Sequence, residues 1–426
     1  MNIVEIIDKK SKKLSLTKEE IDFFVNGLMS GIVKDYHAAS LLMAIKINGF
    51  TDQETINYAT ALINSGETLP LKNDFVDKHS SGGIGDKTSI ALLPILGAMN
   101  VKIFKISGRG LGFTGGTIDK LESIKGFNAE LGIEKVYKMV EEIGISLTGQ
   151  TPNLTPADGK IYSLRDITAT VDSIPLIAAS IISKKIASGA KNILIDMKIG
   201  SGAFMKNIEE GQELARLMKL IANKYNRNLF VLFSSMDQPL GFSVGNKLEV
   251  IEAIEFLKGN YSIDFYELVK KISIELHSKS KNVSKEESEK IFEEVIKSGT
   301  AFKLQKEWFK RHGVSNYEKG IKFEPKFKKI INSEEEGYVF FKNLKNLGNA
   351  LIALKAGREF KNEKLDFDSG IKFLKKQGEK INKNEPLFEV TSSKEISEEI
   401  IQTILKVFDF TNDPIETKVI LGEVKW

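Results

Sequence analysis

The chain has 426 residues, of which 42% are hydrophobic and 28% charged, which is typical of a folded protein with more than one domain. A net charge of +4, with acidic and basic residues interspersed, disfavours a nucleic-acid binder, which would carry a concentrated basic face. The absence of cysteine excludes disulfides, cysteine-zinc sites and thiol nucleophiles. No apolar run reaches the ~18 residues of a membrane span, and the N-terminus lacks the apolar core of a signal peptide, so we expect a cytoplasmic protein without membrane contact.

The first 65 or so residues have the periodicity of helices. In "LTKEEIDFFVNGLMSG", Thr17 and Glu20 have the spacing of a capping box, and apolar residues then recur on one helical face. A more apolar helix is predicted in "HAASLLMAIKINGF". Thr51 and Glu54 open a third helix, "TDQETINYATALINSG". We therefore predict a small helical domain.

From about residue 75 the pattern changes to short β-rich runs that end in small residues. Such runs are "VKIFKIS" at 101–107, "NILIDMKIGSG" at 192–202 and "NLFVLFSS" at 228–235, and helical stretches lie between them. Strands that alternate with helices predict an α/β domain with a mostly parallel central sheet, whose ligands bind at the carboxyl ends of the strands.

A helical insert interrupts this pattern. "DSIPLIAASIISKKIASG" has Ser173 as a plausible N-cap and Pro175 in its first turn, and its apolar residues resemble those of the N-terminal helices. Past about residue 335, strand-like runs and turn formers predict a small C-terminal α+β module. The predicted organisation is a helical domain (1–68 and 156–189), an α/β domain (69–155 and 190–334) and the module (335–426).

The stretch "DKHSSGGIGDKTS" at 77–89 follows a predicted strand and precedes an apolar helix. A glycine loop that leads into a helix N-terminus presents free backbone N–H groups to an anion. Lys78, Ser80 and Ser89 add donors. The nucleotide-binding P-loop pattern nearly fits, but Asp86 replaces the glycine before the lysine and excludes it. His79 lies beside this anion site, which favours an acid/base or leaving-group role over a structural one.

A second glycine loop, "KISGRGLGFTGGTIDKLES" at 105–123, offers Ser107 and Thr117 as hydroxyl donors. Gly110, Gly112 and Gly115 satisfy G-x-G-x-x-G, so a dinucleotide-binding dehydrogenase is an alternative. No acidic residue follows a second strand at the spacing that ribose recognition needs. Two loops with cations and hydroxyls fit one shared anion better than an extended dinucleotide.

The third segment is "YSLRDITATVDSIPLIAASIISKK" at 162–185. Ser180 and Lys184 are four residues apart and share one helical face. Such a pair taken alone is as readily a solvated surface feature. Together with Arg165, however, it could grip a planar ring that carries carbonyls and a ring N–H. A metal-hydrolase motif and a serine-hydrolase nucleophile elbow are both missing from the sequence.

These segments, with "MDQPLGFSVGNKLEV", closely resemble the sequence blocks of the thymidine and pyrimidine-nucleoside phosphorylases. The resemblance implies a homodimer of two-domain subunits that catalyse reversible phosphorolysis of a pyrimidine nucleoside to free base and (deoxy)ribose 1-phosphate. It implies that His79, Arg165, Ser180 and Lys184 are catalytic and bind the pyrimidine, with a protonated His79 near the base O2 as the candidate acid. The phosphate-binding residues that it implies are Lys78, Ser80, Ser89, Lys105, Ser107 and Thr117.

Two further expectations follow from the resemblance. Lys105 occupies a position that resembles the lysine of the broad-specificity enzymes, where the thymidine-specific bacterial enzymes typically have methionine. The expected substrates are therefore uridine, thymidine and deoxyuridine. No organic cofactor is expected. A potassium site is implied at Gly85, Lys87, Leu240, Ser243 and Glu252, although Lys87 departs from the threonine usual there, and its ammonium group could weaken or replace the cation.

Three alternatives remain at the level of sequence. One is a thymidine-specific phosphorylase. Another is a phosphoribosyltransferase-like protein of the same architecture, which would need magnesium and an acidic pair for pyrophosphate. The third is a non-catalytic nucleoside-binding protein, which would keep the glycine loops without needing His79 and Lys184.

Overall fold

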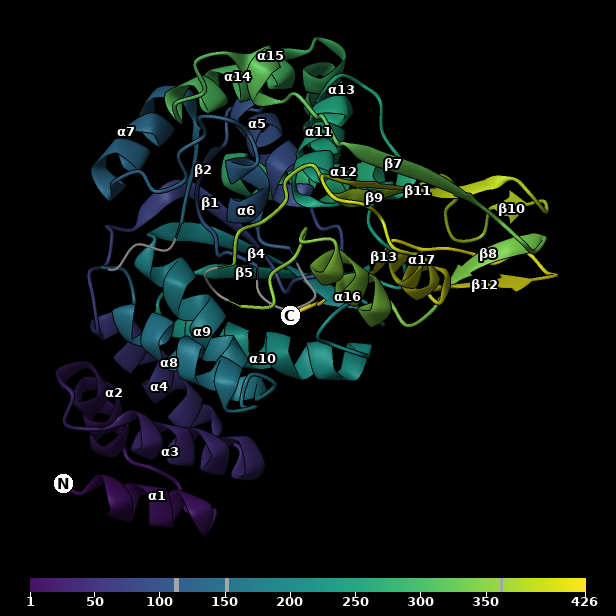
Figure 1. Cartoon of the computed structure of the whole chain (residues 1–426). Coiled ribbons are helices and arrows are strands. Elements are labelled where there is room, and N and C mark those ends of the chain that lie inside the picture. Colours follow the sequence, from purple (N-terminus) through teal and green to yellow (C-terminus); the bar gives the residue numbers. More distant parts are fainter. Residues whose placement is uncertain (111–114, 150–152, 361–362) are drawn as a thin grey trace.

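The fold is that of a computed structural model, in which residues 1–110, 115–149, 153–360 and 363–426 are described. A helical domain lies at one end of the molecule, and the N-terminus is at its outer edge (Figure 1). Its helices are α1 (Ile3–Ser11), α2 (Lys18–Ser30), α3 (Asp35–Asn48), α4 (Asp52–Asn64), α8 (Pro156–Ile167) and α9 (Ile174–Ala187). The predicted capping boxes are confirmed, because Thr17 and Thr51 each accept from the backbone N–H of a glutamate that reaches back.

The helices α8 and α9 pack on the N-terminal helices, although about 90 residues separate them in the chain. α9 lies against α4, and α8 lies against α3. Leu176, Ala179 and Ile182 of α9 are fully buried and share one apolar cluster with Phe24 and Leu62. The insert therefore packs with the helical domain, and α9 also contacts a helix and a strand of the α/β domain.

The centre of the molecule is a six-stranded sheet of order β13-β5-β4-β1-β2-β3, which is parallel except for β13. Its strands are β1 (Lys72–Ser80), β2 (Lys102–Ile106), β3 (Ile145–Thr148), β4 (Ala190–Ile199), β5 (Asn228–Ser235) and β13 (Ile420–Glu423). The interior strand β4 is buried along nearly its whole length, as expected for a strand covered on both faces. The predicted fold class is confirmed.

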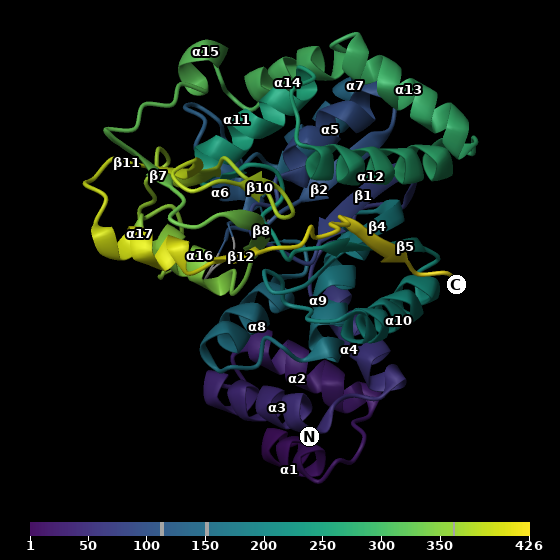
Figure 2. The same ribbon diagram turned by 90° about the vertical axis from the view of Figure 1, so that its right-hand side faces the viewer.

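Helices cover both faces of this sheet (Figures 1 and 2). One face is covered by α9 and α10 (Ile208–Lys224). The other face carries α5 (Thr88–Ala98), α6 (Thr117–Glu122), α7 (Ile133–Ile143), α11 (Asn246–Leu257), α12 (Ile263–Lys281), α13 (Lys285–Lys297), α14 (Thr300–Arg311) and α15 (Tyr317–Gly320).

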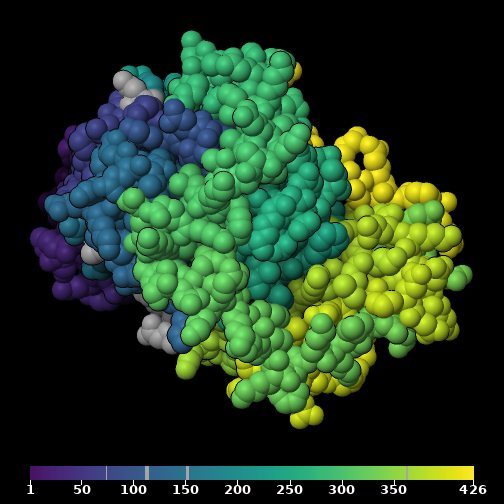
Figure 3. All heavy atoms as spheres, turned by 90° about the horizontal axis from the view of Figure 1, so that it is seen from above, coloured from purple at the N-terminus to yellow at the C-terminus, as the bar shows by residue number. Residues whose placement is uncertain are grey.

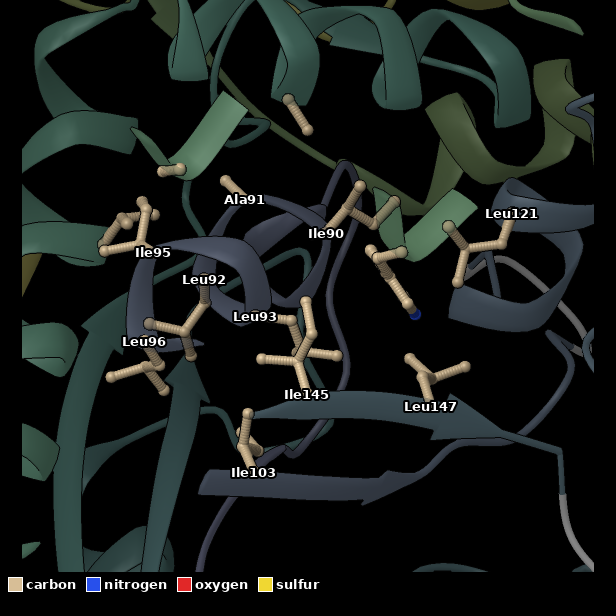
Figure 4. Packing of buried hydrophobic residues seen from close by; sticks show 14 of the residues in the cluster. Ile90, Ala91, Leu92, Leu93, Ile95, Leu96, Ile103, Leu121, Ile145 and Leu147 are labelled. Atoms are coloured by element: carbon tan, nitrogen blue, oxygen red, sulfur yellow. The ribbon is translucent and has the colours of Figure 1, made fainter. Parts of the chain in front are cut away.

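Helix α5 is apolar all round and lies at the centre of this second layer. Its side chains, including Leu93 and Leu96, pack over Ile103 of β2 and Ile145 of β3 (Figure 4). These residues are fully buried. The first turn of α5, which follows the first glycine loop, is therefore anchored rigidly in the core.

The C-terminal module packs against the α/β domain (Figures 1 and 3). It contains a four-stranded sheet, β6-β9-β11-β7, a three-stranded sheet, β10-β8-β12, and two helices. Their bounds are β6 (Ser243–Val244), β7 (Phe327–Asn332), β8 (Gly337–Phe341), α16 (Lys345–Ala353), β9 (Gly370–Phe373), β10 (Lys380–Ile381), β11 (Pro386–Ser392), α17 (Glu398–Leu405) and β12 (Phe408–Thr411).

The predicted boundary of the module at 335–426 needs correction on both sides. β7 precedes residue 335 but pairs with β11, and β6 comes from the α/β domain and pairs with β9. β13 follows the module but returns to the central sheet, where it pairs antiparallel with β5. The physical reason is that edge strands need partners, and a short strand carries no sequence signal of which sheet it completes.

Candidate active site

A cavity of about 310 Å³ lies between the helical and α/β domains, at the carboxyl ends of β1 and β2. The sheet contributes its two glycine loops, and the helical domain contributes α8 and α9. All but one of the predicted catalytic and phosphate-binding residues line this cavity. They are His79, Ser80, Ser89, Lys105, Ser107, Thr117, Arg165, Ser180 and Lys184.

The first glycine loop connects β1 to α5. Gly82 and Gly85 have positive φ values of 93° and 77°, which glycine adopts readily. A Cβ atom at Gly83 would lie 2.7 Å from Cε of Met236, so the backbone there passes close to its neighbour. The loop thus turns sharply and brings Ser80, at the end of β1, and Ser89, in the first turn of α5, to the same cavity.

The second glycine loop connects β2 to α6. Ser107 directly follows β2, and its backbone N–H donates to the Thr148 carbonyl at 2.9 Å. The backbone N–H of Gly110 donates to Asp119 at 2.7 Å, which folds the loop back over α6. Gly112, the second glycine of the dinucleotide pattern, lies outside the described residues. Thr117, the first residue of α6, reaches the cavity half-buried.

Lysine side chains make the wall of the cavity around His79 strongly electropositive. Lys105 and Lys185 are buried, and both line the cavity. Lys105 donates to the Lys78 carbonyl at 2.5 Å, and Lys185 pairs with Asp77 at 2.9 Å. Burial, together with Lys185, lowers the pKa of Lys105 to about 7. These lysine side chains place N–H donors for a bound anion at the cavity wall.

The surroundings of His79 set its charge state in the free protein. Burial and the ammonium groups of Lys185, Lys105, Lys184 and Lys78 hold the pKa of His79 well below its usual range. The imidazole is therefore neutral at neutral pH in the free protein, and the role of His79 as a protonated acid in the substrate complex stays a prediction. A neutral ring still offers one N–H donor to a base carbonyl.

Lys78 is the one predicted phosphate ligand that does not line the cavity. It is fully buried, and its ammonium nitrogen lies 2.9 Å from Asp196 and 3.9 Å from Asp86. Although burial disfavours its charged form, Asp196 and Asp86 raise the pKa of Lys78. The Asp196 carboxylate is therefore the ion-pair partner of this ammonium group. The role of Lys78 as a phosphate ligand stays a prediction.

The helical-domain wall holds the residues predicted to bind a pyrimidine. The Lys184 ammonium lies 2.6 Å from Asp158 and donates to Ser180 at 3.4 Å. Arg165 is buried and donates to three backbone carbonyls, those of Thr170 at 3.2 Å, Leu176 at 3.3 Å and Val171 at 2.6 Å. Arg165 therefore also holds the segment that connects α8 to α9.

Sequence reasoning missed Tyr162 and Phe204, two aromatic residues that line the cavity. The Tyr162 ring lies 5.8 Å from the Lys184 ammonium and 6.0 Å from the Arg165 guanidinium carbon, as in cation–π contacts. Tyr162 is three residues before Arg165 on the same helix, and that spacing was a usable signal. Phe204 follows β4 in a turn, and only the fold brings it to this cavity.

The residues of the implied potassium site lie together on the other side of the first glycine loop. The Lys87 ammonium donates to the Leu240 carbonyl at 2.6 Å, the Ser243 carbonyl at 2.7 Å and the Glu252 carboxylate at 2.8 Å. Gly85 is adjacent, since a Cβ atom there would lie 3.3 Å from the Leu240 oxygen. In the described part of the chain, no group of three or more histidine, aspartate and glutamate residues could hold a metal ion.

We expect Lys105→Met to change how stability depends on pH. The pKa of Lys105 in the folded protein is about 7, below its usual 10.5, so between these values the unfolded chain holds more protons. Wild-type stability therefore gains from rising pH across this window, by at most about 1.4 kcal/mol per pH unit for one proton. Urea unfolding at several pH values should show that Lys105→Met loses this gain.

Lys102→Met is the matched control for this experiment. Lys102 lies on the same strand, and hydrogen bonding to Glu141 raises its pKa. Replacing Lys102 should leave the slope of unfolding free energy against pH, between pH 7 and 10.5, as in the wild type. Equal slopes of unfolding free energy against pH for wild type and Lys105→Met would contradict the lowered pKa of Lys105.

Comparison with known proteins identifies the architecture that carries this site. Three family models match. They are "Glycosyl transferase family, a/b domain" over residues 72–302, "Glycosyl transferase family, helical bundle domain" over 4–66 and "Pyrimidine nucleoside phosphorylase C-terminal domain" over 338–411. An anthranilate phosphoribosyltransferase from Thermus thermophilus shares the fold, with a TM-score of 0.58 and 18% identity over 72% of this chain and 98% of that chain. No described helix is both long and apolar enough to cross a membrane.

Curated relatives are similar over nearly the whole chain. The pyrimidine-nucleoside phosphorylase of Bacillus subtilis is 42% identical over 98% of each chain. The enzyme of Staphylococcus epidermidis is 43% identical over 93% of this chain and 94% of its own. The enzyme of Staphylococcus aureus is 41% identical over 95% of each chain. With the glycine loops and α9 arranged around one cavity, the chain belongs to the thymidine/pyrimidine-nucleoside phosphorylase family of glycosyl transferases.

Proposed function

We propose that the protein catalyses reversible phosphorolysis of uridine, thymidine and deoxyuridine to the free base and (deoxy)ribose 1-phosphate. The observation that carries this proposal is the single cavity in which hydroxyl and ammonium donors on two glycine loops face the Arg165, Ser180 and Lys184 set on α8 and α9. The loops suit a phosphate ion, and the helices suit a planar base. The relatives named as pyrimidine-nucleoside phosphorylases support the same assignment.

In the proposed reaction, phosphate is the nucleophile and no protein nucleophile is needed. A phosphate oxygen forms a bond to C1′ of the sugar while the C1′–N1 glycosidic bond breaks, and the electron pair of that bond leaves on the pyrimidine. Ser80, Ser89 and Ser107 are placed to hold the phosphate beside the sugar. Holding both reactants in one orientation removes much of the entropic barrier to their encounter.

The leaving pyrimidine carries negative charge on N1, O2 and O4. Donors that face this charge stabilise the transition state more than the ground state. Lys184 and Arg165 supply positive charge, and His79 supplies a neutral N–H donor for O2. Bound phosphate is an anion beside His79, so it opposes the effect of the surrounding ammonium groups and raises the pKa of the imidazole. The base then takes up a proton from this polar wall or from solvent.

The phosphate loops and the base-binding helices lie in different domains, so closure of the cleft would bring the two reactants together and exclude water. We also propose that the protein is a cytoplasmic homodimer. Absence of cysteine suits a reducing compartment. Exposed apolar residues on and beside α1–α3 offer a surface for a second copy, namely Val4, Leu14, Ile32, Tyr36 and Ile47. Sedimentation equilibrium would test the dimer.

The test of the activity is to incubate the protein with uridine or thymidine and to follow free base with and without phosphate. We expect release of base, with sugar 1-phosphate as co-product, only when phosphate is present. Base release independent of phosphate would instead show a hydrolase. Binding of nucleoside without any turnover would favour a non-catalytic binding protein.

We expect Lys105→Met to lower kcat/KM for uridine more than for thymidine. Lys105 is buried at the cavity wall, where its amine could donate to the ribose 2′-OH that thymidine lacks. Loss of one such hydrogen bond amounts to roughly a tenfold difference between the two substrates. Competition between uridine and thymidine in one reaction measures the ratio directly. A uniform loss on both substrates would assign Lys105 to phosphate alone.

A further inference from the structure

The segment 239–243, which we call the clamped loop, is held by two buried lysines, Lys87 and Lys376. Lys376, of the C-terminal module, donates to the carbonyls of Pro239 at 2.5 Å and Gly241 at 2.6 Å. Lys87 donates to two other carbonyls of the same segment, those of Leu240 at 2.6 Å and Ser243 at 2.7 Å. Four carbonyls within five residues therefore point at two cations.

The position of the Lys87 ammonium has the ligand chemistry of a monovalent-cation site. Backbone carbonyls replace the hydration shell of such a cation in proteins, and a carboxylate adds the balancing charge. Here the carboxylate is Glu252, which is oriented by the backbone N–H groups of Phe242 at 2.6 Å and Ser243 at 2.8 Å. Gly241 leaves the space for it, since a Cβ atom there would lie 2.4 Å from Oε1 of Glu252.

Lys87 uses this oxygen set completely. A lysine ammonium has three N–H donors, and Lys87 has three acceptors at 2.6, 2.7 and 2.8 Å. The residue is 1% exposed, and the Phe265 ring lies 5.8 Å from the nitrogen. A potassium ion would have to share the same three oxygens with a fixed positive charge in a low-dielectric interior, which is strongly unfavourable. The residues present therefore do not fit a potassium ion.

We propose that the ammonium group of Lys87 is a covalently attached substitute for a monovalent cation, so that this protein needs no potassium. Lys87 is the N-cap residue of α5, between Asp86 and the first-turn residue Ser89, both of which line the cavity. Its hydrogen bonds connect the start of α5 to the clamped loop. The clamped loop leads into β6, which pairs with β9 of the C-terminal sheet. The Lys87 ammonium thus holds the first glycine loop in place at any salt composition.

The test compares melting temperature in potassium chloride with that in tetramethylammonium chloride at equal ionic strength. Wild type should melt at the same temperature in both salts. Lys87→Thr removes the ammonium and leaves the oxygen set, so its melting temperature should fall in tetramethylammonium and recover as potassium is added, as for any ligand that binds only the folded state. Lys87→Met, whose side chain fills the space without charge, should fall in both salts.

Lys10→Thr is the matched control. Lys10 is also a buried ammonium paired with a glutamate, Glu54 at 2.8 Å, but no backbone carbonyl accepts from it among the described residues. Its loss of stability should not recover with potassium. Rubidium-soaked crystals give a second readout, with anomalous density expected at the clamped loop in Lys87→Thr and not in wild type.

Turnover gives a third readout, which rests on the proposed function. Without potassium, kcat/KM of Lys87→Thr for phosphate should fall by about tenfold relative to wild type and recover with the ion. A wild-type melting temperature that rises specifically with potassium, or rubidium density at the wild-type loop, would overturn the inference. So would a Lys87→Thr protein that potassium does not restabilise. The melting and rubidium results stand even if the phosphorolysis assay fails, so the two proposals fail separately.

Discussion

Replacing Arg165 by alanine is expected to lower kcat/KM for pyrimidine nucleosides by about 10²–10³-fold, the usual cost of removing one donor that faces transition-state charge. From the sequence alone we would expect the loss of turnover to exceed the loss of stability. The structure adds a stability cost, because Arg165 is buried and donates to the carbonyls of Thr170, Val171 and Leu176. Leaving these carbonyls unpaired costs about 2–4 kcal/mol of unfolding free energy.

Steady-state kinetics and urea unfolding on the same preparations separate the two effects. Arg227→Ala is the matched control, since Arg227 is a buried arginine that contacts the Ile186 carbonyl at 3.5 Å and does not line the cavity. It should lose stability with unchanged kcat/KM. If Arg165→Ala behaves like Arg227→Ala, the residue is structural only. Arg165→Lys should remain impaired, because an ammonium group cannot reproduce the planar fork of donors.

Replacing Gly116 by alanine is expected to reduce kcat/KM for phosphate by about 100-fold, the effect of displacing a catalytic group by ~1 Å. The backbone of Gly116 has φ −86° and ψ 145°, which alanine adopts freely, so the obstacle is steric. An added Cβ atom would lie 2.0 Å from the Gly110 nitrogen and 2.4 Å from the Arg109 carbonyl carbon. These are backbone atoms, and Asp119 holds the Gly110 N–H in place at 2.7 Å.

The loop must therefore shift where Ser107 and Thr117 meet the cavity. Measuring the reaction rate at increasing phosphate concentrations gives the effect on kcat/KM, and thermal melting checks that the fold is retained. Gly132→Ala is the control, because Gly132 precedes α7, has a negative φ, and has open space where the Cβ atom of an alanine would lie. Unchanged phosphate kinetics in Gly116→Ala would show that the second glycine loop does not bind phosphate.

Local chemistry made much of the molecule predictable from sequence. The capping boxes at Thr17 and Thr51 involve partners three residues away, and the strand runs at 101–107 and 228–235 are visible as short apolar segments. The two glycine loops and the 162–185 helix segment are continuous motifs, and knowledge of the family placed them around one ligand. Each of these signals is contained within a few turns of chain, where spacing alone specifies geometry.

Long-range packing decided the remainder. Oxygens 153, 156 and 165 residues further along the chain surround the Lys87 ammonium, and no local pattern encodes that encounter. The neutral state of His79 results from burial and from lysines on three different elements, β1, β2 and α9. The structural role of Arg165, which donates to carbonyls of the segment between α8 and α9, depends on how that segment folds back. Sequence by itself predicted which residues carry the chemistry, whereas their charge states and partners were set by the tertiary structure. The reason is that electrostatic energies depend on burial and on distances between residues that only folding brings together.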